Sequence, residues 1–332
     1  MRARLGIASA AIALVLGIAA CGGPSVGPVS GASSDPNAAA QATVRKNWRD
    51  AADRWYAVYL AEQGRNPRAI LETSRALLML DDAESANNMI DQGLAAHPED
   101  VDLLEMKADI MVSMGYRRPA ERYYQRVLDK DPERASALLA IGRARIQLGL
   151  EGSAIAPLQE LVRVRGGDYE SYSLLARALK GSGDASGAFA AWKQAFQHPG
   201  ATIEDMLTAA ALSLDANVRR AHPDATAVCH GWLEKAIAFD PQCSSAHFQL
   251  GLLSEETGAV DAAITHYRRA VELDPGCLHA LTNLAILYSS RGDEPKTREM
   301  VQRALQFEVE ADRRRALLRL LDPFERKSEE KS

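Results

Sequence analysis

The chain has 332 residues and a formal net charge of −5, with 47% hydrophobic and 25% charged residues. A mildly acidic chain without a long basic run argues against nucleic acid as a partner. Its composition, rich in Ala, Leu, Arg and Glu, favours helix over strand, so we expect an all-α fold.

The first residues have the layout of an export signal. Arg2 and Arg4 precede an apolar run over 5–20 that is too short for a comfortable transmembrane helix. The run ends in Ile18-Ala19-Ala20-Cys21, which resembles the lipobox of bacterial lipoproteins. The resemblance implies a signal peptide over 1–20, a lipidated Cys21 and, because Gly22 follows, an outer-membrane anchor facing the periplasm. An ordinary cleaved signal, which would leave a soluble periplasmic protein, is the alternative.

Two segments separate this signal from the body of the chain. Residues 21–42 are mostly Gly, Ser, Ala, Pro and Val, and we expect a flexible tether after the lipidated Cys21. Residues 43–66 contain Trp48, Trp55 and Tyr59 at helical spacing and end in a Gly-Arg-Asn-Pro stop signal. This second segment is predicted to be an N-terminal capping helix.

From residue 67 onward, helix-turn signals recur at an interval of 34 residues. Turn glycines keep this interval at Gly115, Gly149 and Gly183, and again at Gly258 and Gly292. Small residues and Asp-Pro helix terminators follow the same spacing. The spacing divides the chain into seven units: 67–100, 101–134, 135–168, 169–202, 203–243, 244–277 and 278–311.

The unit 244–277 contains a complete set of these signals, and this set resembles that of a tetratricopeptide repeat (TPR). Its residues are Leu250-Gly251, Gly258, Ala263, Tyr267 and Asp274-Pro275. The resemblance implies a right-handed superhelical solenoid of helical hairpins. The fifth unit, 203–243, contains about seven extra residues around 217–224, which we expect to bulge as a loop. Residues 312–332 are predicted to form a C-terminal capping helix, stopped by Asp322-Pro323, and a polar tail.

The sequence offers little that could perform catalysis, and we expect neither an enzyme nor a cofactor. Cys229 and His230 are neighbours on a helix, so they point in different directions, and Cys229 is expected to be a buried, inert thiol. Cys243 and Cys277 occupy equivalent positions too far apart for a disulfide. Three histidines in neighbouring units lack the spacing of a metal site, so no metal is expected; they are His247, His266 and His279.

The TPR resemblance implies that the first helix of each hairpin lines an inner binding face. In the first four units the ninth position is Arg75, Asp109, Arg143 and Arg177. These arginines either hold carboxylates of an acidic segment, or are solvated or paired with Glu72, Asp109 and Glu170. In the last two units this face is more apolar, which predicts a docking groove unless the C-terminal helix folds back into it or these residues belong to the core. Its residues are Phe248, Leu252, Thr282, Asn283 and Ile286.

Taken together, the resemblances imply a lipid-anchored scaffold that binds protein or peptide segments of an envelope complex. The general plan is similar to that of TPR lipoproteins of pilus assembly and secretion. Cell-wall or exopolysaccharide machinery is the alternative, and a hydrolase with a site near His222, Cys229 and His230 is a more distant one. No nucleic acid, no small-molecule substrate and no membrane contact beyond the lipid anchor is expected.

Overall fold

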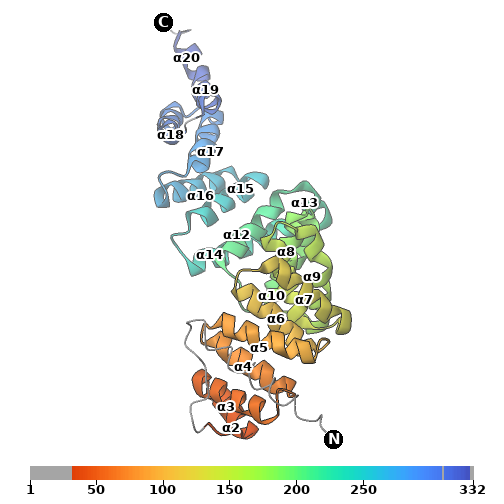
Figure 1. The fold of residues 1–332 in the computed structure, drawn as a ribbon. Coiled ribbons are helices and arrows are strands. Elements are labelled where there is room, and N and C mark those ends of the chain that lie inside the picture. The colour runs from red at the N-terminus through yellow and green to blue at the C-terminus, as the bar shows by residue number, and fades with distance from the viewer. Residues whose placement is uncertain (1–31, 309, 330–332) are drawn as a thin grey trace, which may run out of the picture. The chain divides into compact units, whose positions relative to one another are not determined.

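The computed structural model describes residues 32–308 and 310–329, and these residues form helices without strands (Figure 1). The signal peptide, Cys21 and residues 22–31 of the predicted tether lie outside the described residues. The chain divides into a first body that ends at Ala144 and a second that begins at Arg145. None of the described helices is long and apolar enough to cross a membrane.

The first body is a series of antiparallel helices, two of which precede the first predicted repeat. Each later pair lies within one of the 34-residue units. The helices are α2 (Pro36–Val44), α3 (Trp48–Ala61), α4 (Pro67–Met79), α5 (Ala83–Ala96), α6 (Val101–Ser113) and α7 (Arg117–Lys130), followed by α8 (Ala135–Gln147), which continues past Ala144.

The second body continues the pattern of paired helices. It contains α9 (Glu151–Arg165), α10 (Tyr169–Gly181), α11 (Ala185–Ala195), α12 (Ile203–Ala211), α13 (Ala216–Ala221), α14 (Ala225–Phe239), α15 (Ser244–Glu256), α16 (Val260–Leu273), α17 (Leu278–Ser290), α18 (Glu294–Phe307), α19 (Ala311–Arg319) and α20 (Asp322–Glu329). The all-α prediction is confirmed.

The periodic glycines form the turns within the hairpins. Gly115 has φ +84°, in the left-handed region, and the other turn glycines of the series have the same sign. A Cβ disfavours this conformation, which explains why glycine recurs there. In the first hairpin Asp81 takes the position with φ +63°. Asp is one of the few other residues that tolerates it.

A small residue on the first helix lets the two helices of a hairpin approach closely. A Cβ added to Gly251 would lie 2.3 Å from the ring of Tyr267, which is fully buried on the facing helix. Ala263 is also fully buried. Ala263 and Tyr267 belong to a core that continues through α17 and α18 and includes Leu281 and Leu284.

The N-terminal region differs from the expectation. Residues 36–44 form helix α2, although 36–42 were assigned to the tether, and 43–66 hold α3 after a break at Lys46, which has φ +55°. Asp35 caps α2, and Ala39 and Ala42 are buried in one cluster with Trp55. Because alanine is both a strong helix former and apolar, a segment that reads as a low-complexity linker packs as a helix.

Two further expectations are corrected. The insert of the fifth unit is not a bulging loop, since it forms α13 and its His222 ring packs on Phe189, 4.9 Å between centroids. The capping helix α19 does end before Asp322-Pro323, at Arg319, but a second helix, α20, begins at Asp322 and extends into the predicted polar tail, and Phe324 is buried. Proline is tolerated in the first turn of a helix, where its missing N–H is not needed.

Candidate functional site

The predicted arginine row begins with two residues that have partners in the first body. Arg75 is exposed and pairs with Glu72 at 2.7 Å, the local pairing that the sequence left open. Asp109 accepts a hydrogen bond from Tyr124. Loss of hydration raises the pKa of the Asp109 carboxyl, which the Tyr124 hydrogen bond and the nearby Arg75 partly offset. This part of the row is engaged in contacts within the chain.

Arg143 and Arg177 lie on α8 and α10. Arg143 is exposed. Arg177 pairs with Asp205 of α12 at 2.7 Å rather than with Glu170, and Asp205 is only 3% exposed. Thr202 Oγ1 and Tyr169 also donate hydrogen bonds to Asp205. Arg177 therefore joins two consecutive hairpins.

Sequence reasoning missed two polar networks between hairpins of the first body. Lys107 is only 4% exposed, and its ammonium lies between Asp91 and Asn87, 2.7 Å from Asn87 Oδ1. Arg134 pairs with Asp102 and Glu105. Each pair lies 16 or more residues apart in the chain, so only the stacking of hairpins brings the partners together.

The predicted apolar groove of the last two units is mostly occupied by packing. Phe248 and Leu252 are half-buried against the core of α16–α18, and the Phe248 ring lies between Tyr267 and His279. Asn283 donates to Tyr267 Oη at 3.0 Å, and Thr282 donates to its own helix at Leu278 O. Ile286 is the member of the set that is exposed, at 46%. Phe248, Leu252, Thr282 and Asn283 are thus half-buried, between the exposed groove and the core position that the sequence left open.

The cysteines have the environment of inert thiols. Cys229 is fully buried, and desolvation raises the pKa of its thiol to about 12. Cys229, Cys243 and Cys277 are all unpaired, as expected for the described residues. His222 is held against α11 by Ser186, so it does not face the Cys229 thiol, whose contact is Ala209 O. The geometry gives no support to a nucleophile at the insert.

Two of the three histidines considered as metal ligands do meet. The rings of His247 and His266 stack with centroids 6.1 Å apart. Desolvation, and the positive charges around them, lower the pKa of both. His279 instead contacts Phe248. Within the described ranges no group of three or more His, Cys, Asp and Glu side chains could hold a metal ion.

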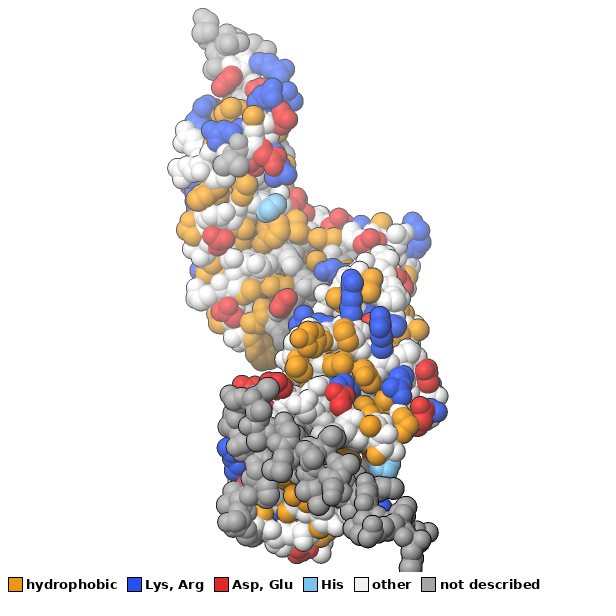
Figure 2. Space-filling view, in the orientation of Figure 1, with side chains coloured by type: hydrophobic (Ala, Val, Ile, Leu, Met, Phe, Trp, Pro, Cys, Tyr) orange, Lys and Arg blue, Asp and Glu red, His pale blue; other side chains and the backbone are white. Residues whose placement is uncertain are grey.

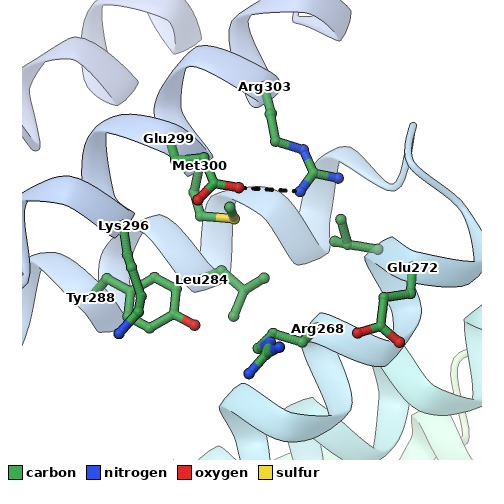
Figure 3. Close-up of a pocket in the computed structure, with 9 residues that line it drawn as sticks. Arg268, Glu272, Leu284, Tyr288, Lys296, Glu299, Met300 and Arg303 are labelled. Atoms are coloured by element: carbon green, nitrogen blue, oxygen red, sulfur yellow. Dashed lines mark ion pairs between the residues drawn. The ribbon is translucent and has the colours of Figure 1, made fainter.

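A hollow lies elsewhere in the second body, between α16, α17 and α18 (Figure 3). This cleft has a volume of about 310 Å³. Its charged residues are Arg268, Glu272, Lys296, Glu299 and Arg303, and its apolar lining is Val271, Leu284, Tyr288 and Met300. This cleft could not be predicted from the sequence, because its residues are distributed over three helices without a shared spacing.

Comparison with known proteins supports the repeat assignment. A family model described as "Tetratricopeptide repeat" matches residues 112–170 and 231–276. The solved C-terminal part of a TPR repeat-containing protein from Cytophaga hutchinsonii is similar with a TM-score of 0.54 at 17% identity, covering 73% of this chain and 96% of that one. The likeness in structure concerns the fold alone.

Two curated proteins share a shorter stretch. Both are named "Probable biofilm formation methyltransferase WspC", one from Pseudomonas putida and one from Pseudomonas aeruginosa. They are 30% and 36% identical over 29% and 25% of this chain. The match spans only about a fifth of the relatives' own length, 22% and 19%.

The matches to the family model and to the solved repeat structure lead to one conclusion. The chain contains tetratricopeptide repeats and has the all-α repeat fold in which such hairpins stack.

Proposed function

We propose that this protein is a lipid-anchored scaffold of the bacterial envelope that binds segments of other proteins along its repeats. The observation that carries the proposal is the stack of TPR hairpins, an architecture whose usual role is protein binding. On its first helices, Arg75, Arg143 and Ile286 present exposed side chains beyond those that form the core. The stack supplies a surface for a partner.

The anchor is proposed from the sequence before the described residues. Ile18-Ala19-Ala20-Cys21 supports lipidation of Cys21, and acyl chains on that residue would hold the repeats near a membrane surface. Assembly of a pilus or secretion machine is the setting to which the overall plan is most similar. The methyltransferase activity named for the Pseudomonas relatives is not part of the proposal, because the shared stretch is short.

Fractionation of cells that express the full chain tests the anchor. We expect wild-type protein in the membrane fraction, with a mass that reflects loss of residues 1–20 and gain of lipid. The substitution Cys21→Ser should move the protein to the soluble fraction or leave the signal uncleaved. Unlipidated wild-type protein with a soluble distribution would overturn the anchor.

Photo-crosslinking tests the binding role. A photoreactive residue at Arg143 or Ile286 in the lipidated protein should capture an envelope protein, whereas one at Ile141, which is buried on the same helix as Arg143, should capture none. Ile286 is a better probe than Leu252, since Leu252 is half-buried against the core. Absence of captured protein at both exposed positions, with the protein folded and abundant, would contradict binding along the first helices.

A further inference from the structure

The cleft between α16, α17 and α18 has charged walls and an apolar floor. Val271, Leu284, Tyr288 and Met300 are all buried at its base, while Arg268, Lys296 and Glu299 are exposed around it. Its volume of about 310 Å³ lies at the lower end of the range for ligand pockets. A space of this size takes one or two side chains rather than a large cofactor.

The charges of the cleft are not balanced. Both glutamates have an arginine partner, since Glu272 pairs with Arg269 at 3.2 Å and Glu299 with Arg303 at 3.7 Å. Arg268, in contrast, has no ion pair or hydrogen bond from its side chain to any residue that the structure describes. An unpaired guanidinium at the wall of a cleft is available for an external carboxylate.

Two further donors face the same space. Lys296 lies over the Tyr288 ring, 5.2 Å from its centroid, and it is close enough to Arg268 for the two positive charges to oppose each other. Its one ion-pair partner, Asp293, lies on its own helix one turn before it. In Figure 3 Arg268 and Lys296 extend on the two sides of the Tyr288 side chain. Within the described residues, the Tyr288 hydroxyl makes no hydrogen bond.

The surroundings favour a short peptide over an extended polyanion. Basic, acidic and apolar side chains are interspersed on the face of α16–α20 drawn in Figure 2, and the lining of the cleft itself includes Glu272 and Glu299 beside its cations, so neither is a wide positive field. A polyanion would need such a field, because its affinity comes from many phosphate contacts. An apolar floor beside three donors matches an acidic residue next to an aliphatic one.

We propose that this cleft binds an acidic segment of a partner protein, with a carboxylate between Arg268 and Lys296 and a neighbouring aliphatic side chain on Leu284 and Met300. The proposal rests on the scaffold function proposed above and adds the chemistry of one partner segment. Charge complementarity carries it, since the cleft holds a cation that no residue of the described chain neutralises.

Selection from a phage-displayed library of random short peptides tests the proposal on the full-length protein in detergent. We expect wild-type protein to enrich peptides in which Asp or Glu adjoins Leu, Ile, Val or Met. One enriched peptide is then titrated by fluorescence anisotropy. Arg268→Glu should weaken its binding at least about tenfold, the size expected for one charged hydrogen-bonded contact. Binding should also weaken as salt is raised.

Arg298→Glu is the matched control. It makes the same charge change on α18, but Arg298 pairs with Glu294 and does not line the cleft. This variant should bind the peptide as wild type does. Arg268→Gln removes the charge without reversing it and should also lose binding, and unchanged thermal melting of each variant shows that it is folded.

Three results would overturn the proposal. They are a selection that enriches no acidic-aliphatic peptides, one that enriches them equally with Arg268→Glu, and a peptide whose aliphatic residues can be replaced by Ser without loss. The last would make the cleft a site for small anions only. None of these results bears on the anchor or on capture at Arg143 and Ile286, so failure here is distinct from failure of the scaffold function.

Discussion

The hairpins α4–α7 of the first body and α15–α18 of the second share a turn pattern but use their polar side chains differently. In the first pair, Lys107 and Arg134 are held by carboxylates of neighbouring helices. In the second, an exposed Arg291–Asp261 ion pair joins the hairpins at 2.7 Å, but the buried contacts between them are mainly apolar and aromatic, and within the described residues Arg268 has no such partner. An arginine in a repeat thus suggests binding only after its partners within the fold are known.

The largest loss of stability that would sharpen this comparison is expected at the buried Lys107 ammonium of the first body. Asp91→Ala leaves Lys107 charged, buried and bonded only to Asn87, and should lower the free energy of opening α5–α6 by about 3 kcal/mol. Lys107→Met keeps the shape and removes the charge, so it should cost about 1 kcal/mol or less. Amide hydrogen exchange of α5 and α6 measures both.

Equal losses in the two variants would contradict this account. The ion pair between the buried Lys107 and the exposed Asp91 would then itself stabilise the first body, beyond compensating the burial of the ammonium. The hairpins α4–α7 would in that case depend on charge to a degree that the apolar hairpins α15–α18 do not.

In the second body, the equivalent sensitive point is packing rather than charge. Gly251→Ala places a Cβ 2.3 Å from the Tyr267 ring and should lower the stability of α15–α16 by about 2 kcal/mol. Gly231→Ala on α14 is the control, because a Cβ there has no neighbour within 4 Å. It should stabilise its helix by about 0.5 kcal/mol. If hydrogen exchange finds α15–α16 no less stable in Gly251→Ala than in wild type, the Tyr267 ring moves aside freely.

A smaller effect should appear as a pH dependence confined to the second body. Burial lowers the pKa of His247 and His266 below the usual 6.5, so the unfolded chain binds protons first as the pH falls. Stability is therefore unaffected above about pH 7 and decreases below it, until the folded histidines are also protonated. The other charged groups at this site are Arg269 and His230, the latter beside Glu234.

Hydrogen exchange of α14–α16 between about pH 7 and pH 5 measures this decrease, after correction for the intrinsic exchange rate. The double variant His247→Gln, His266→Gln should show a shallower decrease than wild type, while α4–α7 of the first body should be unaffected by the variant. A slope in the double variant as steep as in wild type would assign the pH dependence to other groups.

The hairpins could be predicted from the sequence because their determinants are local. The turn glycines, the small residues at Gly251 and Ala263, and the Asp-Pro terminators act over distances of a few residues. Helix α2 could not, since an alanine-rich segment packs or not according to what lies beside it, and Ala39 and Ala42 lie in the cluster of Trp55. The ion-pair partner of a charged residue on a first helix could not be predicted either, because the partner of Arg177 lies 28 residues away in the chain.

The cleft could not be predicted from the sequence, because three helices must meet to form it. The smallest effect that we predict concerns Arg268, the cation at its wall. Arg268→Gln should change the stability of α16–α18 by no more than about 0.5 kcal/mol, because no residue that the structure describes makes an ion pair or hydrogen bond with its side chain. Arg177→Gln is the contrasting variant and should cost about 1.5 kcal/mol, since it deprives the buried Asp205 of its cation. Hydrogen exchange compares the two arginines within one body. A cost at Arg268 that equals the cost at Arg177 would mean that Arg268 stabilises the fold, and the difference between structural and binding arginines would disappear.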